Sequence, residues 1–176
     1  MILTFGIITK SGTAAIVYSD EDIFFNSLSK KLAPVEWIKF AHSKGLNNVW
    51  LVKDSRLTRS IRRIKEKEIF VNIDETYWRN YAGPPIYAKS PEESIVMKFL
   101  HEVGHFVSAH SGTEGLVVDK LGISRDFETK VTQQSFFSKM SDSRESEAWQ
   151  YAISIRDNQK ELFKNLLDSY KLMSIK

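Results

Sequence analysis

The chain has 176 residues, 42% of them hydrophobic and 27% charged, which is typical of a folded globular protein with a substantial core. Its formal net charge of +3 is too small to indicate a nucleic-acid partner by itself. There is no cysteine, so disulfides, cysteine zinc ligands and thiol nucleophiles are excluded, and any metal must be held by His, Asp or Glu.

The N-terminal residues are apolar but lack the features of a secretory signal. No positively charged segment precedes the apolar run, and Lys10 interrupts it. The chain contains no uninterrupted apolar stretch of the roughly 20 residues that span a bilayer. We therefore expect a soluble, cytoplasmic protein with no membrane partner.

In chain order, the first half alternates between strand and helix signals. Residues 2–9 and 14–18 are β-branched and apolar on either side of turn residues, which predicts an N-terminal hairpin. Capping and periodicity predict helices over 22–33 and 35–44, the second opened by a proline and closed by a glycine. The remaining predicted elements of this half are a strand at 48–53, a basic helix at 55–67 and a strand at 68–74.

The second half is mostly helical. Pro91 and the two acidic residues after it favour a helix start, and an apolar pattern carries this helix to Ser111-Gly112. The elements predicted after it are a loop at 113–126, a helix at 127–139 and a helical stretch from 143 to 172 with a break near 157–158. This order predicts an α+β fold, with the hairpin and a small mixed sheet followed by an active-site helix and a C-terminal helical part.

The sequence His101-Glu102-Val103-Gly104-His105 matches the pattern H-E-x-x-H within that helix. Residues four apart lie on one helical face, so the two imidazoles can converge on one cation, and imidazole-rich tetrahedral sites favour Zn²⁺. Glu102 can then accept the proton of a water in the open coordination position. The pattern therefore predicts a hydrolytic zinc site, and the alternative is a pair of surface histidines with an incidental glutamate.

A catalytic zinc site usually has three protein ligands. Position 111 is Ser, so no third histidine follows at the H-x-x-G-x-x-H spacing, and a carboxylate from another element must complete the set. Glu145 and Glu147 lie at the start of a helix that can pack across the motif helix. Acidic residues also favour helix N-termini without binding metal, but the motif upstream favours Glu145 as a ligand.

Three segments together resemble the gluzincin metallopeptidases, and most of all the ImmA/IrrE family of small intracellular zinc peptidases: EIFVNID, HEVGHFVSAH and ESEAWQYA. The resemblance covers residues 68–155. It implies that His101, His105 and Glu145 bind zinc and that Glu102 is the catalytic base.

The resemblance also implies that the strand at 68–74 is the sheet edge along which an extended substrate pairs. Trp149 stands where the family has Asn or Asp, so hydrogen-bonding support of a ligand histidine is expected from elsewhere. The gap of 40 residues between His105 and Glu145 is long for the family and keeps Glu147 as the alternative ligand. We expect a single domain, 1–176, comprising an unmatched part at 1–66, a metallopeptidase-like core at 67–155 and a C-terminal helix at 156–176.

Two further residues near the motif are candidates for the site. Tyr151 can donate a hydrogen bond to a developing oxyanion, although its place in the pattern is typical of core residues. His110 does not share the helical face of the two ligand histidines, so we interpret it as a cation that favours the helix C-terminus, with a substrate contact as the alternative.

The leading hypothesis is a zinc-dependent endopeptidase whose partner is a protein or peptide substrate, a regulatory protein being one candidate. The alternative is a non-catalytic metal-binding regulatory or interaction module. A DNA-binding regulator that uses the basic cluster at 56–67 is the third hypothesis. It is disfavoured because acidic residues dilute the cluster and no aromatic residues interleave it.

Overall fold

The computed structural model describes residues 5–8, 14–17, 21–57, 60–63, 66–108 and 143–174. The chain divides into two compact units, Met1–Leu28 with Gly112–Asp142 and Ser29–Ser111 with Ser143–Lys176. The predicted loop at 113–126, the predicted helix at 127–139 and His110 lie outside the described residues. That the whole chain forms one domain stays a prediction.

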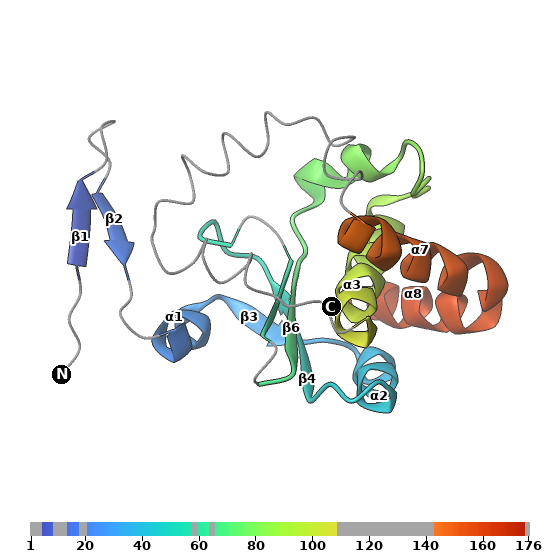
Figure 1. The fold of residues 1–176 in the computed structure, drawn as a ribbon, viewed down its shortest axis with the longest axis horizontal. Coiled ribbons are helices and arrows are strands. Elements are labelled where there is room, and N and C mark those ends of the chain that lie inside the picture. The colour runs from blue at the N-terminus through green and yellow to red at the C-terminus, as the bar shows by residue number, and fades with distance from the viewer. Residues whose placement is uncertain are drawn as a thin grey trace. The chain divides into compact units, whose positions relative to one another are not determined.

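The first unit contains a pair of strands and a helix among its described residues (Figure 1). β1 (Phe5–Ile8) pairs antiparallel with β2 (Ala14–Val17), and Phe5 lies opposite Val17. This pairing confirms the predicted N-terminal hairpin. The helix that follows, α1 (Glu21–Ser27), is shorter than the predicted helix at 22–33.

The last part of that predicted helix is a strand of the second unit instead. β3 (Lys30–Leu32) pairs antiparallel with β4 (Asn48–Val52), so that Lys30 lies opposite Val52. The helical prediction was wrong here because residues 30–32 satisfy backbone hydrogen-bonding groups along one side of β4, and this tertiary requirement overrides the local helical pattern.

The second unit is built on a four-stranded mixed sheet in the order β3-β4-β6-β5. β4 runs parallel to β6 (Glu68–Asn72), with Val49 opposite Ile69, and β5 (Ile61–Arg63) runs antiparallel to β6. A small mixed sheet followed by helices confirms the predicted α+β class, and β4 and β6 confirm the strands predicted at 48–53 and 68–74.

Two predictions about this sheet are wrong. The described part of the basic stretch 55–67 contributes β5 rather than a helix, because its backbone pairs with β6 and the buried Arg63 forms ion pairs with Glu66 and Glu68. The strand at 68–74 is not a sheet edge, because β5 occupies the side of β6 that faces away from β4. The edges of the sheet are therefore β3 and β5.

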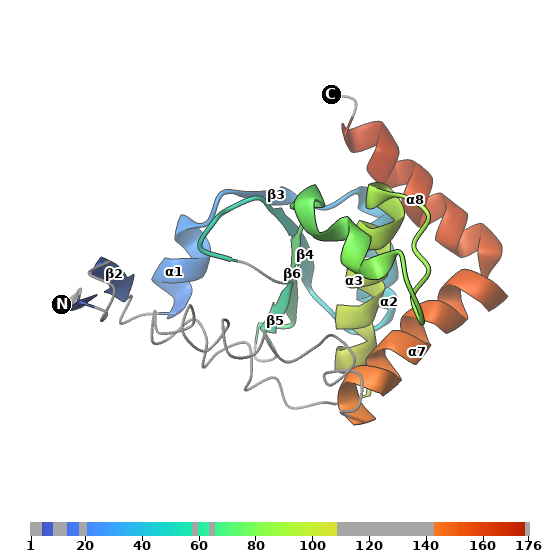
Figure 2. The same cartoon turned by 90° about the horizontal axis from the view of Figure 1, so that it is seen from above.

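Helix α3 packs on the sheet, and helices α7 and α8 pack on α3. α3 (Pro91–Val107) follows the short 3-10 helix η1 (Glu75–Tyr81), and the hydroxyl of Ser90 caps it by accepting a hydrogen bond from the Glu93 N–H. α7 (Ser143–Asn158) and α8 (Lys160–Ser174) confirm the predicted helical stretch and its break. In Figure 2, α3 lies between the sheet and these two helices, and every residue from 93 to 105 is buried.

α3 is shorter than the sequence predicts. It ends at Val107, and the predicted end at Ser111-Gly112 is wrong because the backbone of Ser108 already leaves helical geometry, with ψ near 4°. Within the described ranges, no helix combines the length and the apolar character that crossing a membrane requires.

α2 (Val35–Ser43) begins after Pro34 and ends before Gly45, as predicted, and the φ of +89° at Gly45 suits glycine. Its fully buried Trp37 stacks on Phe99 of α3 at 4.5 Å between ring centroids. The indole N–H of Trp37 also donates to the carbonyl of Leu166 at 2.8 Å. These contacts join α2, α3 and α8, so the helix that bears the motif is held firmly on two sides.

Candidate metal centre

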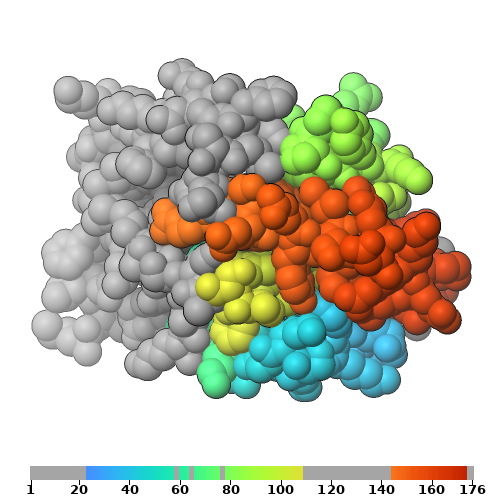
Figure 3. Space-filling view, turned by 45° about the vertical axis from the view of Figure 1, so that its right-hand side comes forward, coloured from blue at the N-terminus to red at the C-terminus, as the bar shows by residue number. Residues whose placement is uncertain are grey.

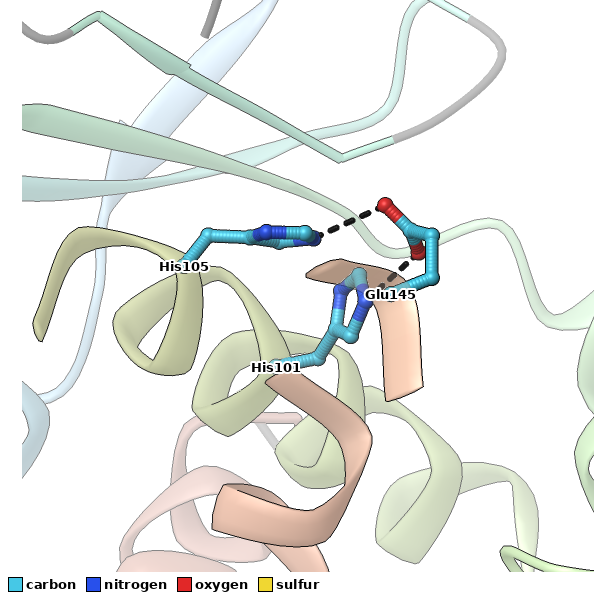
Figure 4. Close-up of side chains that lie close together, drawn as sticks. All are labelled: His101, His105 and Glu145. Atoms are coloured by element: carbon cyan, nitrogen blue, oxygen red, sulfur yellow. Dashed lines mark hydrogen bonds and ion pairs between the residues drawn. The ribbon is translucent and has the colours of Figure 1, made fainter. Parts of the chain in front are cut away.

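Three side chains from two helices converge at one point (Figure 4). His101 and His105 lie one turn apart on α3, and Glu145 lies in the first turn of α7. Nε2 of His101 is 3.0 Å from Oε2 of Glu145, and Nε2 of His105 is 2.9 Å from its Oε1. Their ligand atoms all lie within 4.8 Å of one another. Two imidazoles and a carboxylate are a donor set that fits a divalent metal and leaves one tetrahedral position open.

The position of Glu145 depends on the close approach of α7 to α3, and in Figure 3 the orange atoms of α7 lie against the yellow atoms of α3. A Cβ atom at Gly104 would lie 2.9 Å from the carbonyl oxygen of Ala148 and 3.1 Å from its Cα. Only glycine leaves room for the α7 backbone at this distance. Because Ala148 is less than one turn after Glu145, this contact sets the distance of the carboxylate from the two histidines.

Gly104→Ala should therefore disturb both the fold and the metal site. The added methyl group meets backbone rather than a flexible side chain, so α7 must move, and we expect a loss of about 1–3 kcal/mol in the free energy of unfolding together with weaker metal affinity. Urea unfolding and a metal titration measure the two effects. Gly83→Ala is the matched control, since a Cβ there meets nothing within 4 Å. Equal behaviour of the two variants would contradict this account.

Glu102 is buried beside the first histidine. Its Oε1 is 3.2 Å from Nδ1 of His101, and its Oε2 is 3.5 Å from Nη1 of Arg62, which comes from β5. Sequence reasoning did not assign Arg62 to the site, because it interpreted residues 55–67 as a helix. The isoleucines at 61 and 64 are three residues apart, which is helical spacing, so no strand signal in the sequence pointed to Arg62.

Trp149 supports His101 by stacking rather than by hydrogen bonding. Its ring lies 4.1 Å from the His101 ring at an angle of 27° between the planes, and the residue is buried. Tyr81 packs on the indole in turn, at 5.6 Å between centroids. The indole thus fixes the orientation of the imidazole by stacking. In the ImmA/IrrE family, which the sequence resembles, this position holds Asn or Asp.

The charges of the site are strongly coupled. Burial would lower the pKa of His101, but hydrogen bonds with Glu102 and Glu145 and their negative charges raise it to about 9. Burial would raise the pKa of both carboxyls, yet each is held below its usual value, that of Glu102 through His101, His105 and Arg62 and that of Glu145 through the two histidines. These shifts favour the charged forms of His101, Glu102 and Glu145.

The chain matches no protein-family model, no curated protein and no solved structure. The resemblance to gluzincins and to the ImmA/IrrE family therefore rests on the three sequence segments and stays a prediction. The arrangement of His101, His105 and Glu145 is an independent observation, since it comes from how α3 and α7 pack.

The other predicted site residues lie differently. Glu147 is exposed on α7 and is not among the described groups that could hold a metal, which favours Glu145 over it. The hydroxyl of Tyr151 is buried and, within the described parts of the chain, has no hydrogen-bond partner, and burial raises its pKa. No described hydrogen bond joins this hydroxyl to the cluster, so its predicted role as an oxyanion donor stays a prediction.

Lys98 is a buried cation one turn before His101. Its Nζ lies 5.0 Å from the ring centroid of Tyr81, and burial lowers its pKa to about 8, although the charge of Asp74 partly opposes this shift. A lysine whose pKa is lower in the folded than in the unfolded chain weakens the fold while it is charged. This penalty is complete below about pH 8 and disappears as the pH rises to the unfolded value.

Lys98→Met should consequently stabilise the protein at neutral pH. Met fills a similar volume without a charge, so we expect a gain of about 1–2 kcal/mol in the free energy of unfolding at pH 7, after the lost contact with Tyr81 is subtracted. The gain should shrink between about pH 8 and 10.5. Urea denaturation of both proteins at pH 7 and pH 10.5 tests this expectation, and a gain that does not depend on pH would contradict it.

Proposed function

We propose that this chain is a zinc-dependent endopeptidase that hydrolyses a peptide bond of a protein or peptide substrate. The observation that carries the proposal is the convergence of Glu145 with His101 and His105, next to the buried carboxylate of Glu102 on the same helix. This set supplies three metal ligands, an open coordination position and a base beside it. A cytoplasmic location stays a prediction.

The residues would divide the reaction as follows. A bound zinc ion supplies Lewis acidity towards a carbonyl group and towards water. Glu102 accepts a proton from the attacking water as the water oxygen bonds to the carbonyl carbon and the carbonyl π pair moves onto oxygen. Glu102 then gives that proton to the amide nitrogen, which leaves as an amine with the electron pair of the broken C–N bond while the C=O bond re-forms.

Burial supports this chemistry. His101 is 8% exposed, His105 3% and Glu102 6%, so two of the metal ligands and the base are largely shielded from bulk water. Charges interact more strongly in such surroundings than in water. The stacking of Trp149 on His101 adds rigidity to the ligand that lies next to the base.

The experiment compares the protein termini that appear in a lysate incubated with zinc-loaded wild type and with Glu102→Gln. The proposal expects new N-termini in a small number of proteins with wild type and none with the variant. Zinc content must be measured on both proteins. Identical sets of termini would rule out the peptidase, and absence of zinc from the wild type would remove the metal site.

One observation favours the alternative of a metal-binding module without turnover. Both oxygens of Glu102 already face a partner, His101 on one side and Arg62 on the other. Such a module would bind zinc and a protein partner and leave that partner intact, so the same lysate experiment separates the two functions. The basic cluster gives little support to a DNA-binding regulator, since its three described arginines, Arg56, Arg62 and Arg63, each face a carboxylate.

A further inference from the structure

Arg62 differs from its neighbours on the edge strand β5. Side chains of successive strand residues point to opposite faces, and Arg63 forms ion pairs with Glu66 at 3.2 Å and Glu68 at 3.5 Å. Arg62 instead points towards α3, where its Nη1 lies 3.5 Å from Oε2 of Glu102. The structure therefore brings one guanidinium to the base of the candidate metal centre and neutralises the other elsewhere.

The guanidinium of Arg62 has one buried donor without a partner among the described residues. The side chain is 13% exposed and has five N–H donors. Its contact with Glu102, at 3.5 Å, is at the long end of the range for an ion pair, and its Nε is buried without a hydrogen-bond partner in the described part of the chain. Leaving a buried donor unpaired is unfavourable, so this guanidinium is suited to bind a ligand that accepts a hydrogen bond.

The charges indicate what kind of ligand this is. The carboxylates of Glu102 and Glu145 would balance a divalent cation held by the two histidines, and the always protonated Arg62 then leaves the site with one positive charge in excess. A site with this surplus next to an open coordination position suits an anionic oxygen.

We propose that Arg62 is a catalytic residue that binds the carbonyl oxygen of the substrate as this oxygen becomes negatively charged. The inference rests on the proposed peptidase function and deepens it. When the water oxygen bonds to the carbonyl carbon, the π electron pair moves onto the carbonyl oxygen, and the N–H groups of Arg62 donate hydrogen bonds to it. Arg62 keeps all its protons, and Glu102 alone transfers one.

Arg62 takes over the role that sequence reasoning gave to Tyr151. The hydroxyl of Tyr151 has no described hydrogen bond, whereas Arg62 contacts the carboxylate that activates water. A guanidinium also presents two parallel N–H groups to an oxyanion, which a phenol cannot do.

The test uses inorganic phosphate as a tetrahedral oxyanion and cobalt as a coloured substitute for zinc. Phosphate is titrated into the cobalt-loaded full chain, and the visible cobalt spectrum reports its binding beside the metal. We expect Arg62→Gln to weaken phosphate binding at least about tenfold, with cobalt affinity unchanged, and Arg62→Lys to restore part of it. The matched control is Lys39→Gln, which removes one positive charge from a side chain that is 67% exposed on α2.

A second comparison separates direct binding from an effect through Glu102. In the Glu102→Gln background, Arg62→Gln should weaken phosphate binding by the same factor as in the wild type. If the effect disappears without the Glu102 carboxylate, Arg62 acts only by positioning the base, and the inference is overturned. With a cleaved substrate in hand, Arg62→Gln should lower kcat by roughly 10²–10³-fold and leave KM nearly unchanged.

The failures of the two proposals can be told apart. A wild type that binds no cobalt overturns the metal site and this inference with it. A wild type that binds cobalt, and whose response to phosphate is absent or the same in Arg62→Gln, overturns the role of Arg62 alone. Phosphate binding that depends on Arg62 in a protein that cleaves nothing supports the anion site and rejects the peptidase.

Discussion

Glu102→Gln should lower the rate of peptide hydrolysis by roughly 10²–10⁴-fold while the metal stays bound. The amide has nearly the shape of the carboxylate but cannot accept the proton of the attacking water. Glu102 is not one of the three groups that converge as ligands, so the ligand set remains complete. The measurements are kcat on a cleaved substrate and zinc content per chain by mass spectrometry.

This variant needs a control for folding, because Glu102 is buried between His101 and Arg62. Removing one member of such a group leaves charges without a partner and can destabilise the fold by itself. Thermal unfolding of the variant answers this point, and Glu102→Asp offers a second comparison, since it keeps the charge and withdraws it by one methylene. If Glu102→Gln is folded, contains zinc and keeps full activity, Glu102 is not the base.

Glu145→Ala should reduce zinc affinity at least about 100-fold, which exceeds the usual loss when only a supporting group around a metal is changed. The substitution removes the one described carboxylate that lies within reach of both imidazoles. Two histidines on one helix then remain, and they make a weak site. Competition for zinc with a chelator of known affinity at pH 7 measures the change.

Glu147→Ala is the matched control for this experiment. Glu147 lies two residues further along α7 and is exposed, so its loss should change zinc affinity less than about threefold. The reverse result, with affinity lost in Glu147→Ala and kept in Glu145→Ala, would mean that α7 presents a different face to the histidines. That result would contradict the role given to the close contact at Gly104 in placing Glu145.

Sequence reasoning succeeded where the signal is local. The spacing of His101 and His105 implies a shared helical face, and Pro34 and Gly45 mark the two ends of α2. The strands β4 and β6 are runs of apolar and β-branched residues that few other structures accommodate.

It failed where the structure depends on pairing between distant segments. Residues 30–32 and 61–63 form strands because their backbones hydrogen-bond to β4 and β6. The residue types of those short segments do not predict this pairing. The same failure gave β6 the role of an edge strand. Arg62 was missed for this reason too, since its approach to Glu102 follows from the register of β5 on β6.

The role of Trp149 could not be predicted from its neighbours in the sequence either. The indole stacks on His101 only because α7 packs against α3 at the short distance that Gly104 allows. A hydrogen-bonding residue at this position would have been recognised by its type, whereas an aromatic residue in a buried helix is ordinary core.

The ligands come from two helices, with His105 and Glu145 separated by 40 positions of the chain. A cation held by both residues would act as a reversible cross-link. It would close the loop of about 40 residues between them, whose closure costs conformational entropy. At a free metal concentration 100 times the dissociation constant, mass action adds about 2.7 kcal/mol to the free energy of unfolding. The metal ligands proposed for catalysis would thus also raise the thermal stability of the protein, and a chelator that removes the metal would lower it.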